Sequence, residues 1–86
     1  MHITTTKKFD KKLKKQPKKI QEEFKKRIKI FMLGTNHPLL KIHKLSGKLQ
    51  NLWSFNLSAD VRIIFDKSQK DTVILVDIGT HSDLYS

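Results

Sequence analysis

The sequence predicts an α+β fold in which an N-terminal helical hairpin packs on a small, mostly antiparallel, four-stranded sheet. Three observations support this prediction. Two lysine-rich segments within residues 7–33 have apolar side chains at helical spacing. Three later segments alternate in polarity or are rich in β-branched residues, which is typical of strands, and short polar turns join them. Helices and strands in separate parts of the chain indicate two packed layers.

The predicted hairpin consists of a helix within residues 7–16 and a second helix over residues 17–33. Pro17 separates them, because proline disrupts a helix interior but suits the first turn of a helix. In the first helix, Phe9 and Leu13 lie four residues apart and form a narrow apolar stripe. The stripe of the second helix consists of Ile20, Phe24, Ile28 and Phe31. The lysines of both helices are expected to point outward.

The predicted sheet takes its strands from residues 2–5, 52–57, 61–66 and 73–78. The last of these opens with four apolar residues in a row, rich in Val and Ile, and continues through Asp77 and Ile78; it predicts a strand that is buried on both faces near the middle of the sheet. Short loops between the last three strands favour antiparallel pairing. Residues 39–45 fit neither a helix nor a strand clearly, and a turn is expected after them.

The composition indicates one small domain over residues 1–86. The chain has no cysteine, which excludes disulfides and thiolate metal sites. No apolar run approaches the length of a membrane span, and no signal peptide is visible, so we expect a cytoplasmic protein with no membrane partner. The sequence contains no glycine-rich phosphate loop and no nucleophile elbow, and its histidines lack metal-ligand spacing. We therefore expect neither a cofactor nor a metal.

The charge of +10 is concentrated at the N-terminus. Residues 1–29 contain twelve basic and three acidic side chains, whereas residues 30–86 contain six and five. The first third is thus a polycation joined to a nearly neutral body. This distribution favours a nucleic acid or an acidic protein as partner, although a lysine surface kept for solubility is the alternative.

Two histidines are candidates for proton transfer. His81 follows the predicted central strand, a common position for site residues, and histidine exchanges protons near neutral pH. His43 lies in the crossover between the helices and the sheet. For each, an ordinary surface histidine is the alternative. Lys44 and Lys48, close to His43, could bind phosphates or simply be solvated.

Asp60 and Arg62 lie two residues apart and share a face if the strand begins at Asp60. They could form a structural ion pair. They could instead act in catalysis, with the carboxylate as a general base or orienting group and the guanidinium on a phosphate. Asp77, within the last strand, could pair with Arg62 in a purely structural role.

Tyr85 could stack on a nucleobase or cover an edge of the core. Trp53 and Phe55 alternate in phase with Leu57, so both are predicted to be core residues. Together, the titratable candidates comprise the groups that a metal-independent ribonuclease needs. One group takes the proton of the ribose 2′-hydroxyl, a cation stabilises the transition state, and an acid protonates the leaving 5′-oxygen.

Four segments follow one another in the second half of the chain: His43-Lys44-Leu45-Ser46-Gly47, Leu52-Trp53-Ser54-Phe55, Asp60-Val61-Arg62-Ile63-Ile64-Phe65 and Asp77-Ile78-Gly79-Thr80-His81-Ser82-Asp83-Leu84-Tyr85. In this order and spacing they resemble the RelE/ParE superfamily of toxins from type II toxin–antitoxin systems. The likeness is greatest to its YafQ-like branch of messenger-RNA interferases, and it extends over essentially the whole chain.

The resemblance implies a RelE-like fold and a cytosolic, ribosome-dependent endoribonuclease. Such a toxin enters the ribosomal A site and cleaves the messenger there without a metal, leaving a 2′,3′-cyclic or 3′-phosphate end. A cognate antitoxin neutralises the toxin. The resemblance also implies a monomer when the toxin is free and a toxin–antitoxin hetero-oligomer when it is bound.

The resemblance also implies roles for five positions. His43 matches the histidine before a Leu-x-Gly turn, Asp60 matches a catalytic aspartate, and Arg62 matches a strand arginine that grips phosphate. His81 matches the histidine of a Gly-Thr-His segment, and Tyr85 matches its terminal aromatic residue. The lysines expected to bind RNA phosphates, without reading sequence, are Lys11, Lys15, Lys18, Lys19, Lys44 and Lys48.

Four positions depart from the family pattern. Asn56 stands where the YafQ-like branch has a further histidine, and Asp77 stands where that branch has an arginine. Trp53 and Phe55 stand where the RelE branch has catalytic lysines. The departures imply either redistributed roles or lower activity. Two other functions stay open: a ParE-like poison of DNA gyrase, which needs no catalytic histidine, and a non-catalytic module that binds RNA or an antitoxin.

Overall fold

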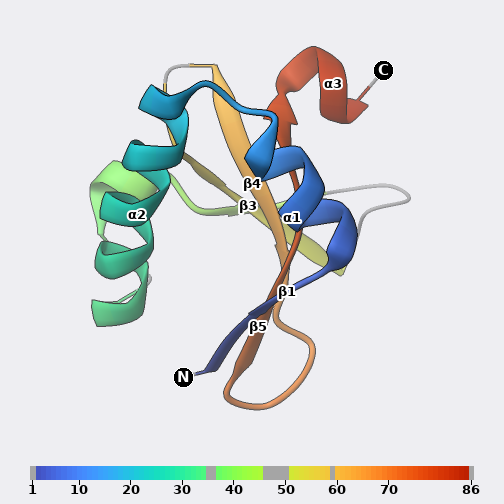
Figure 1. Ribbon diagram of the computed structural model, residues 1–86. Coiled ribbons are helices and arrows are strands. Elements are labelled where there is room, and N and C mark those ends of the chain that lie inside the picture. The colour runs from blue at the N-terminus through green and yellow to red at the C-terminus, as the bar shows by residue number, and fades with distance from the viewer. Residues whose placement is uncertain (1, 35–36, 46–50, 59, 86) are drawn as a thin grey trace.

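Two N-terminal helices and a twisted sheet make up the body of the protein, as the computed structural model shows (Figure 1). The structure describes residues 2–34, 37–45, 51–58 and 60–85, and for Tyr85 it describes only the backbone. The elements are β1 (His2–Thr5), α1 (Lys7–Lys14), α2 (Lys18–Leu33), the short 3₁₀ helix η1 (Pro38–Leu40), β2 (His43–Lys44), β3 (Leu52–Asn56), β4 (Val61–Asp66), β5 (Thr72–Thr80) and α3 (His81–Tyr85).

The sheet has five strands in the order β1-β5-β4-β3-β2. Strand β1 pairs parallel to β5, and the other neighbours pair antiparallel. The expected four-stranded sheet is therefore wrong in two details: the sheet is mixed, and it has an additional edge strand. That strand, β2, comes from the ambiguous segment and is only two residues long, too short for a periodic pattern to reveal it. The turn predicted at residues 46–48 lies outside the described residues.

The helical hairpin is confirmed, with its break at Pro17. Helix α1 begins after Thr6, whose hydroxyl accepts a hydrogen bond from the backbone N–H of Phe9 at 3.1 Å. The side-chain amide of Gln21 donates to the carbonyls of Lys14 and Gln16 at 3.3 and 2.9 Å, so α2 holds the end of α1 directly. Among the described residues, no helix has the length and apolarity needed to cross a membrane.

The core lies between the helices and one face of the sheet. Phe31 of α2 is fully buried at its centre, with its ring centroid 5.1 Å from that of Phe55 and 5.2 Å from that of Phe65. The core prediction is confirmed for Phe55. Trp53 also packs against the core, but it is only half-buried, and the Lys67 ammonium lies 3.8 Å from its ring centroid.

A β-bulge changes how β5 faces the core. Ile64 pairs with Asp77, but the next residue of β4, Phe65, pairs with Leu75. Leu75 and Ile78 are three positions apart and would point to opposite faces of a regular strand. The shift lets both point into the core, and it places Asp77 on the opposite face. The prediction that this strand is buried on both faces is wrong, because Val73 and Leu75 lie in the core whereas Ile74, Val76 and Asp77 on the other face stay partly exposed.

Arg27 connects α2 to the segment that precedes the sheet. Its Nε donates to Glu23 at 2.9 Å, an ion pair between side chains four residues apart on one helix. Its Nη1 donates to the carbonyl of Leu39 at 2.9 Å and to that of Asn56 at 3.1 Å. One guanidinium thus joins α2, η1 and the end of β3, which fixes the start of β2 beside the sheet.

Candidate functional site

The sheet has a second face, which we call the open face, on the side away from the core. Residues paired across neighbouring strands point to the same side, so the strand register defines its rows. One row contains His43, Ser54, Ile64 and Asp77, and the next contains Asn56, Arg62 and Gly79. Pairing thus brings two residues of the expected site, His43 on β2 and Arg62 on β4, onto a single surface.

Arg62 occupies the middle of the open face on β4. Its side chain is half-buried, and its Nε is buried with no hydrogen-bond partner within the described part of the chain. A buried polar donor without a partner is costly, and a guanidinium presents its donors in a fork that matches a phosphate or a carboxylate. The geometry therefore suits an anion bound at this position.

His43 lies on the same face at the sheet edge. Its Nδ1 is 3.1 Å from the carbonyl oxygen of Lys41, which can only accept, so Nδ1 carries the proton. Its Nε2 is 3.2 Å from the hydroxyl of the fully buried Ser54 and accepts from it in the neutral ring. Two strand spacings and two residues separate His43 from Arg62, roughly 12 Å between Cα atoms, so the two side chains face one surface without belonging to one contact cluster.

Asp60 and His81 lie at the end of the open face nearest Arg62. Val61 pairs with Thr80, which puts Asp60, just before β4, and His81, just after β5, at the same end of the sheet. Both side chains are exposed. Tyr85 ends α3 nearby in the chain, but its side chain lies outside the described residues, as does the whole of Lys48.

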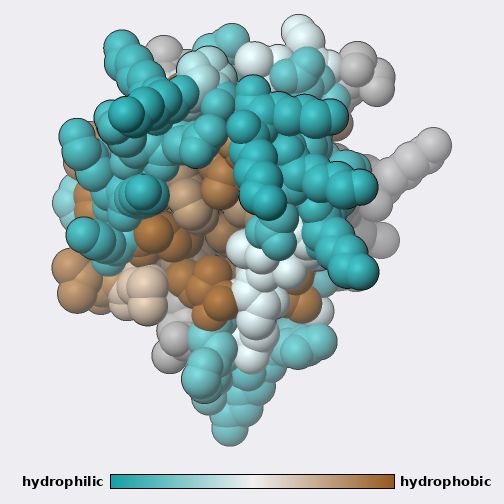
Figure 2. All heavy atoms as spheres, in the orientation of Figure 1, coloured by the Kyte–Doolittle hydropathy of each residue, from teal (hydrophilic) through white to brown (hydrophobic). Residues whose placement is uncertain are grey.

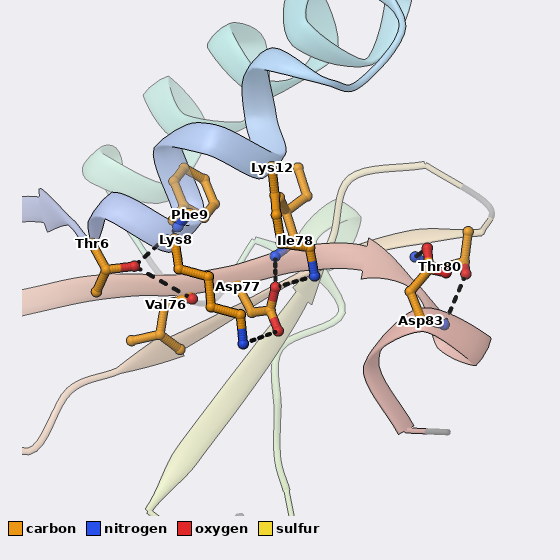
Figure 3. Close-up of polar contacts among 9 residues, drawn as sticks. All are labelled: Thr6, Lys8, Phe9, Lys12, Val76, Asp77, Ile78, Thr80 and Asp83. Carbon is orange, nitrogen blue, oxygen red and sulfur yellow. Dashed lines mark hydrogen bonds and ion pairs between the residues drawn. The ribbon is translucent and has the colours of Figure 1, made fainter.

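Helix α3 is held against the end of β5 by reciprocal hydrogen bonds. The Asp83 carboxylate accepts from the Thr80 N–H at 3.1 Å, and the Thr80 hydroxyl accepts from the Asp83 N–H at 3.1 Å (Figure 3). The bond from the Thr80 N–H is the main cause that lowers the pKa of Asp83. A Cβ on Gly79 would lie 3.0 Å from the Cβ of Asp83. The glycine therefore lets α3, with His81, approach the row of Arg62.

The expected pairing of Asp77 with Arg62 is wrong. Asp77 instead binds two lysines of α1: its Oδ1 lies 2.5 Å from the Nζ of Lys12, and its Oδ2 lies 3.4 Å from the Nζ of Lys8 (Figure 3). Its Oδ1 also accepts from the Ile78 N–H at 2.9 Å. The reason is register, because the cross-strand neighbour of Asp77 is Ile64 and not Arg62.

These contacts determine the charge state of Asp77. Partial burial by itself raises the pKa of the carboxyl. The hydrogen bonds from Lys12 and Ile78, together with the positive charges of Lys12 and Lys8, outweigh the burial and leave the pKa below its ordinary value. Asp77 is thus a carboxylate that holds two ammonium groups beside the open face. Sequence reasoning missed this role of Lys8 and Lys12, although their spacing of four on one helix was a usable signal.

A hollow of about 470 Å³ lies beside this carboxylate. Three strands, the start of α1 and helix α3 contribute to it. Its walls are mainly apolar, with polar groups on one side, and the residues that line it are Thr6, Lys8, Leu52, Ile64, Val76, Asp77 and Leu84.

With this geometry described, the chain can be compared with known proteins. All 86 residues match the family of the bacterial toxin of type II toxin–antitoxin system, YafQ. The chain belongs to this family. No curated protein sequence matches it. The expected membership of the YafQ-like branch is thereby confirmed, and this chain is a YafQ-family toxin.

Solved structures of the YafQ type share the fold. The crystal structure of YafQ from E. coli strain BL21(DE3) superposes with a TM-score of 0.83 at 17% identity, covering 98% of this chain and 97% of that chain. YafQ in the E. coli DinJ–YafQ toxin–antitoxin complex gives 0.80 at 18% identity, with coverages of 98% and 96%. A metal-bound toxin from Helicobacter pylori is 31% identical, with a TM-score of 0.73 and 99% coverage of both chains.

Most of the toxin's lysine surface is where the sequence predicts it. Lys11 and Lys15, at the end of α1, and Lys18 and Lys19, at the start of α2, are all exposed around the turn between the two helices. Figure 2 shows hydrophilic side chains gathered over α1 and over this turn. Lys44 is exposed as well, but it lies on β2 at the far edge of the sheet. Lys12 does not point outward as expected, because Asp77 binds it.

The toxin shows no grouping of metal ligands in its described part: no three histidine, aspartate or glutamate side chains there are arranged to hold a metal ion. His43, Asp60 and His81 come from separate places on the open face.

Proposed function

We propose that this YafQ-family toxin is a ribosome-dependent, metal-independent endoribonuclease that cleaves messenger RNA and thereby inhibits translation. The observation that supports this most is the Arg62 guanidinium, which has a buried donor without a partner in the described chain and lies on the open face at the end where Asp60 and His81 also lie. An anion-binding cation beside titratable groups is what transfer of a phosphoryl group from one ribose oxygen to another requires.

In this mechanism Arg62 binds the scissile phosphate and stabilises the charge that develops on its oxygens. A general base removes the proton of the 2′-hydroxyl, whose oxygen attacks phosphorus. The bond to the 5′-oxygen breaks, and a general acid protonates that leaving oxygen. The product is a 2′,3′-cyclic phosphate, which water can open to a 3′-phosphate. DNA, which lacks the hydroxyl, cannot react in this way.

We assign proton transfer to His81, with His43 or Asp60 as its counterpart. His81 and Asp60 lie closest to Arg62 by strand register, whereas His43 is in the next row and two strands away. Ser54, which donates to Nε2 of His43, holds that ring in one orientation. Tyr85 stacks on a base of the messenger.

The lysine surface docks the toxin on ribosomal RNA. Its exposed ammonium groups contact phosphates, which give affinity and orientation without sequence preference. This proposal places the toxin in the cytoplasm, where the ribosomes are. The lysines concerned are Lys11, Lys15, Lys18, Lys19, Lys44 and Lys48.

We further propose that a cognate antitoxin neutralises the toxin by covering an apolar surface at the end of α2. There Leu33 is 91% exposed, Met32 is 55% exposed, and Leu39 beyond them is 51% exposed. Leu33 also lines a hollow of about 360 Å³, together with Ile30, Gly34 and His37. Figure 2 shows a hydrophobic area between α2 and the sheet.

Clustered apolar side chains of this kind mark protein interfaces, and a protein of charge +10 favours an acidic partner. The DinJ–YafQ complex shows that a toxin of the same fold assembles with an antitoxin. The free toxin is then a monomer, and the bound form is a hetero-oligomer.

The function is tested by mapping messenger ends in a reconstituted translation reaction. The parent toxin should produce new 3′ ends on ribosome-bound messages, and His81→Ala should lower the cleavage rate by about 10²- to 10⁴-fold, because it removes a proton-transfer group. His2→Ala, which changes an exposed histidine on β1, is the matched control and should cleave normally.

Circular dichroism verifies that both variants are folded. If His81→Ala cleaves as fast as the parent, the role of His81 is wrong. If the parent produces no new ends but inhibits gyrase in a supercoiling assay run in parallel, the endonuclease proposal itself is wrong.

A further inference from the structure

We infer that the hollow beside Lys8 and Asp77 is a nucleotide subsite, in which one base of a single-stranded RNA packs on the apolar wall and Lys8 binds the adjoining phosphate. The inference rests on the proposed function, since it names where the neighbouring nucleotide of the messenger lies. The residues of this subsite differ from those to which catalysis is assigned, namely Arg62, Asp60 and the histidines.

The hollow has the size and lining that a nucleobase requires. Its volume of about 470 Å³ is larger than a single base, so a base and part of its sugar can enter. Four apolar side chains form its wall: Leu52, Ile64, Val76 and Leu84. A flat base can pack its face against such a wall whatever its sequence, while its edges and phosphate meet polar groups.

The position of the hollow relative to Arg62 fits the next nucleotide along a strand. Asp77 and Gly79 are two residues apart on one face of β5, and Gly79 is the cross-strand partner of Arg62. The rows of Asp77 and Arg62 are therefore separated by about 7 Å, which is comparable with one nucleotide step of an extended strand. An RNA whose scissile phosphate sits at Arg62 can place its neighbour in the hollow.

The charges at the rim favour a phosphate at Lys8. Asp77 binds Lys12 at 2.5 Å, and the Lys12 side chain is only 31% exposed, so this lysine is committed to the fold. Lys8 lies at 3.4 Å from the same carboxylate and keeps 67% of its side chain exposed. An ammonium has three donors, so Lys8 retains donors that can point toward a ligand in the hollow.

One carboxylate, that of Asp77, contacts both ammonium groups at this rim. Asp83 is a second anion in the field of Lys12, so the exposed cation at the rim is Lys8. Asp77 thus acts as a positioning residue: it holds Lys12 firmly and draws Lys8 to the edge of the hollow. The ammonium group that can bind a phosphate at the edge of the hollow therefore belongs to α1 and not to β5.

The test is an NMR titration of the full chain, labelled on its Ile, Leu and Val methyl groups, with a four-residue RNA that has 2′-O-methyl groups and cannot be cleaved. The methyl signals of Ile64, Val76 and Leu84 should shift in a saturable way. Lys8→Gln should weaken this binding 3- to 10-fold and should lower the slope of log K against log[salt] by about 0.7, the amount expected for one lost phosphate contact on a single strand.

Lys29→Gln is the matched control, because it removes the same charge from an exposed position on α2 that does not line the hollow. It should leave the affinity within twofold of the parent. The inference is overturned if the shifts are confined to the lysine helices, or if both substitutions weaken binding equally. It is also overturned if the hollow's methyl groups respond only to an antitoxin and not to RNA.

This result is separable from that of the cleavage assay. Binding of the uncleavable RNA does not depend on catalysis. If the toxin cleaves the message normally but the methyl signals of the hollow do not shift, the subsite is refuted and the proposed function stands. Shifts at the hollow without message cleavage refute the endonuclease and leave a nucleotide-binding surface.

Discussion

Replacing Asp77 with asparagine tests the charge network that joins α1 to the centre of the sheet. The variant keeps the size and shape of the side chain but removes its charge. The carboxylate accepts from Lys12 and from the Ile78 N–H, and it attracts Lys8. In Asp77→Asn the amide oxygen can still accept from Lys12 and Ile78, but the NH2 group cannot accept from Lys8, and the half-buried Lys12 loses the anion that compensates its charge.

The expected loss of unfolding free energy follows from how exposed the paired side chains are. The Asp77 side chain is 17% exposed and that of Lys12 is 31% exposed, so this contact is worth more than a surface ion pair. Hydrogen bonds to charged groups contribute about 1.5–3 kcal/mol, and the amide retains part of that. The Lys8 pair is largely exposed and adds less than about 1 kcal/mol. We expect Asp77→Asn to lower the free energy of unfolding by about 1–2 kcal/mol at pH 7, a fall in Tm of roughly 5–15 °C.

The pH dependence provides a second, independent measure. Because the pKa of Asp77 is lowered in the folded state, its contribution is fully present above the unfolded pKa of about 3.9 and is lost as the pH falls through the lower folded value. The parent and Asp77→Asn should therefore differ by a constant amount from about pH 5 to pH 8. Their stabilities should converge below about pH 4, where the parent carboxyl becomes protonated as well.

The assay is urea unfolding followed by circular dichroism at a series of pH values. Glu22→Gln, an equal change in charge at an exposed position of α2, is the control and should change stability by less than about 0.5 kcal/mol. Equal stability of parent and Asp77→Asn at pH 7 would refute the reasoning. So would a difference that stays the same size down to pH 3.

Two further predictions concern adjacent residues and the partner surface. Phe31→Ala removes a fully buried ring between two others and should cost about 3–5 kcal/mol in urea unfolding, whereas Met32→Ala, one residue further and 55% exposed, should cost less than about 1 kcal/mol; similar losses for both would contradict the described core. Leu33→Ser should leave stability within about 0.5 kcal/mol but weaken binding of the cognate antitoxin at least tenfold in calorimetry, since it removes a 91% exposed apolar anchor; unchanged affinity would place the antitoxin elsewhere.

The elements that sequence patterns predicted correctly are those set by neighbouring residues. The two helices and their break at Pro17, together with most of the four predicted strands, follow from periodicity and backbone preference within short windows. The uneven charge and the family membership are likewise properties of the sequence itself. The lysines at the turn between the helices are exposed because they lie outside the apolar stripes of both helices.

The tertiary structure alone decided which side chains meet. The parallel partner of β1 and the short edge strand β2 depend on chain segments that lie far apart in sequence. The bond between Lys12 and Asp77 spans 65 positions. In a strand, a shift of one residue reverses the face of every later side chain, and the bulge opposite Ile64 and Phe65 makes such a shift. It sends Ile78 into the core and Asp77 to the open face, where α1 supplies its lysines, and the four apolar residues before Asp77 give no local sign of this shift.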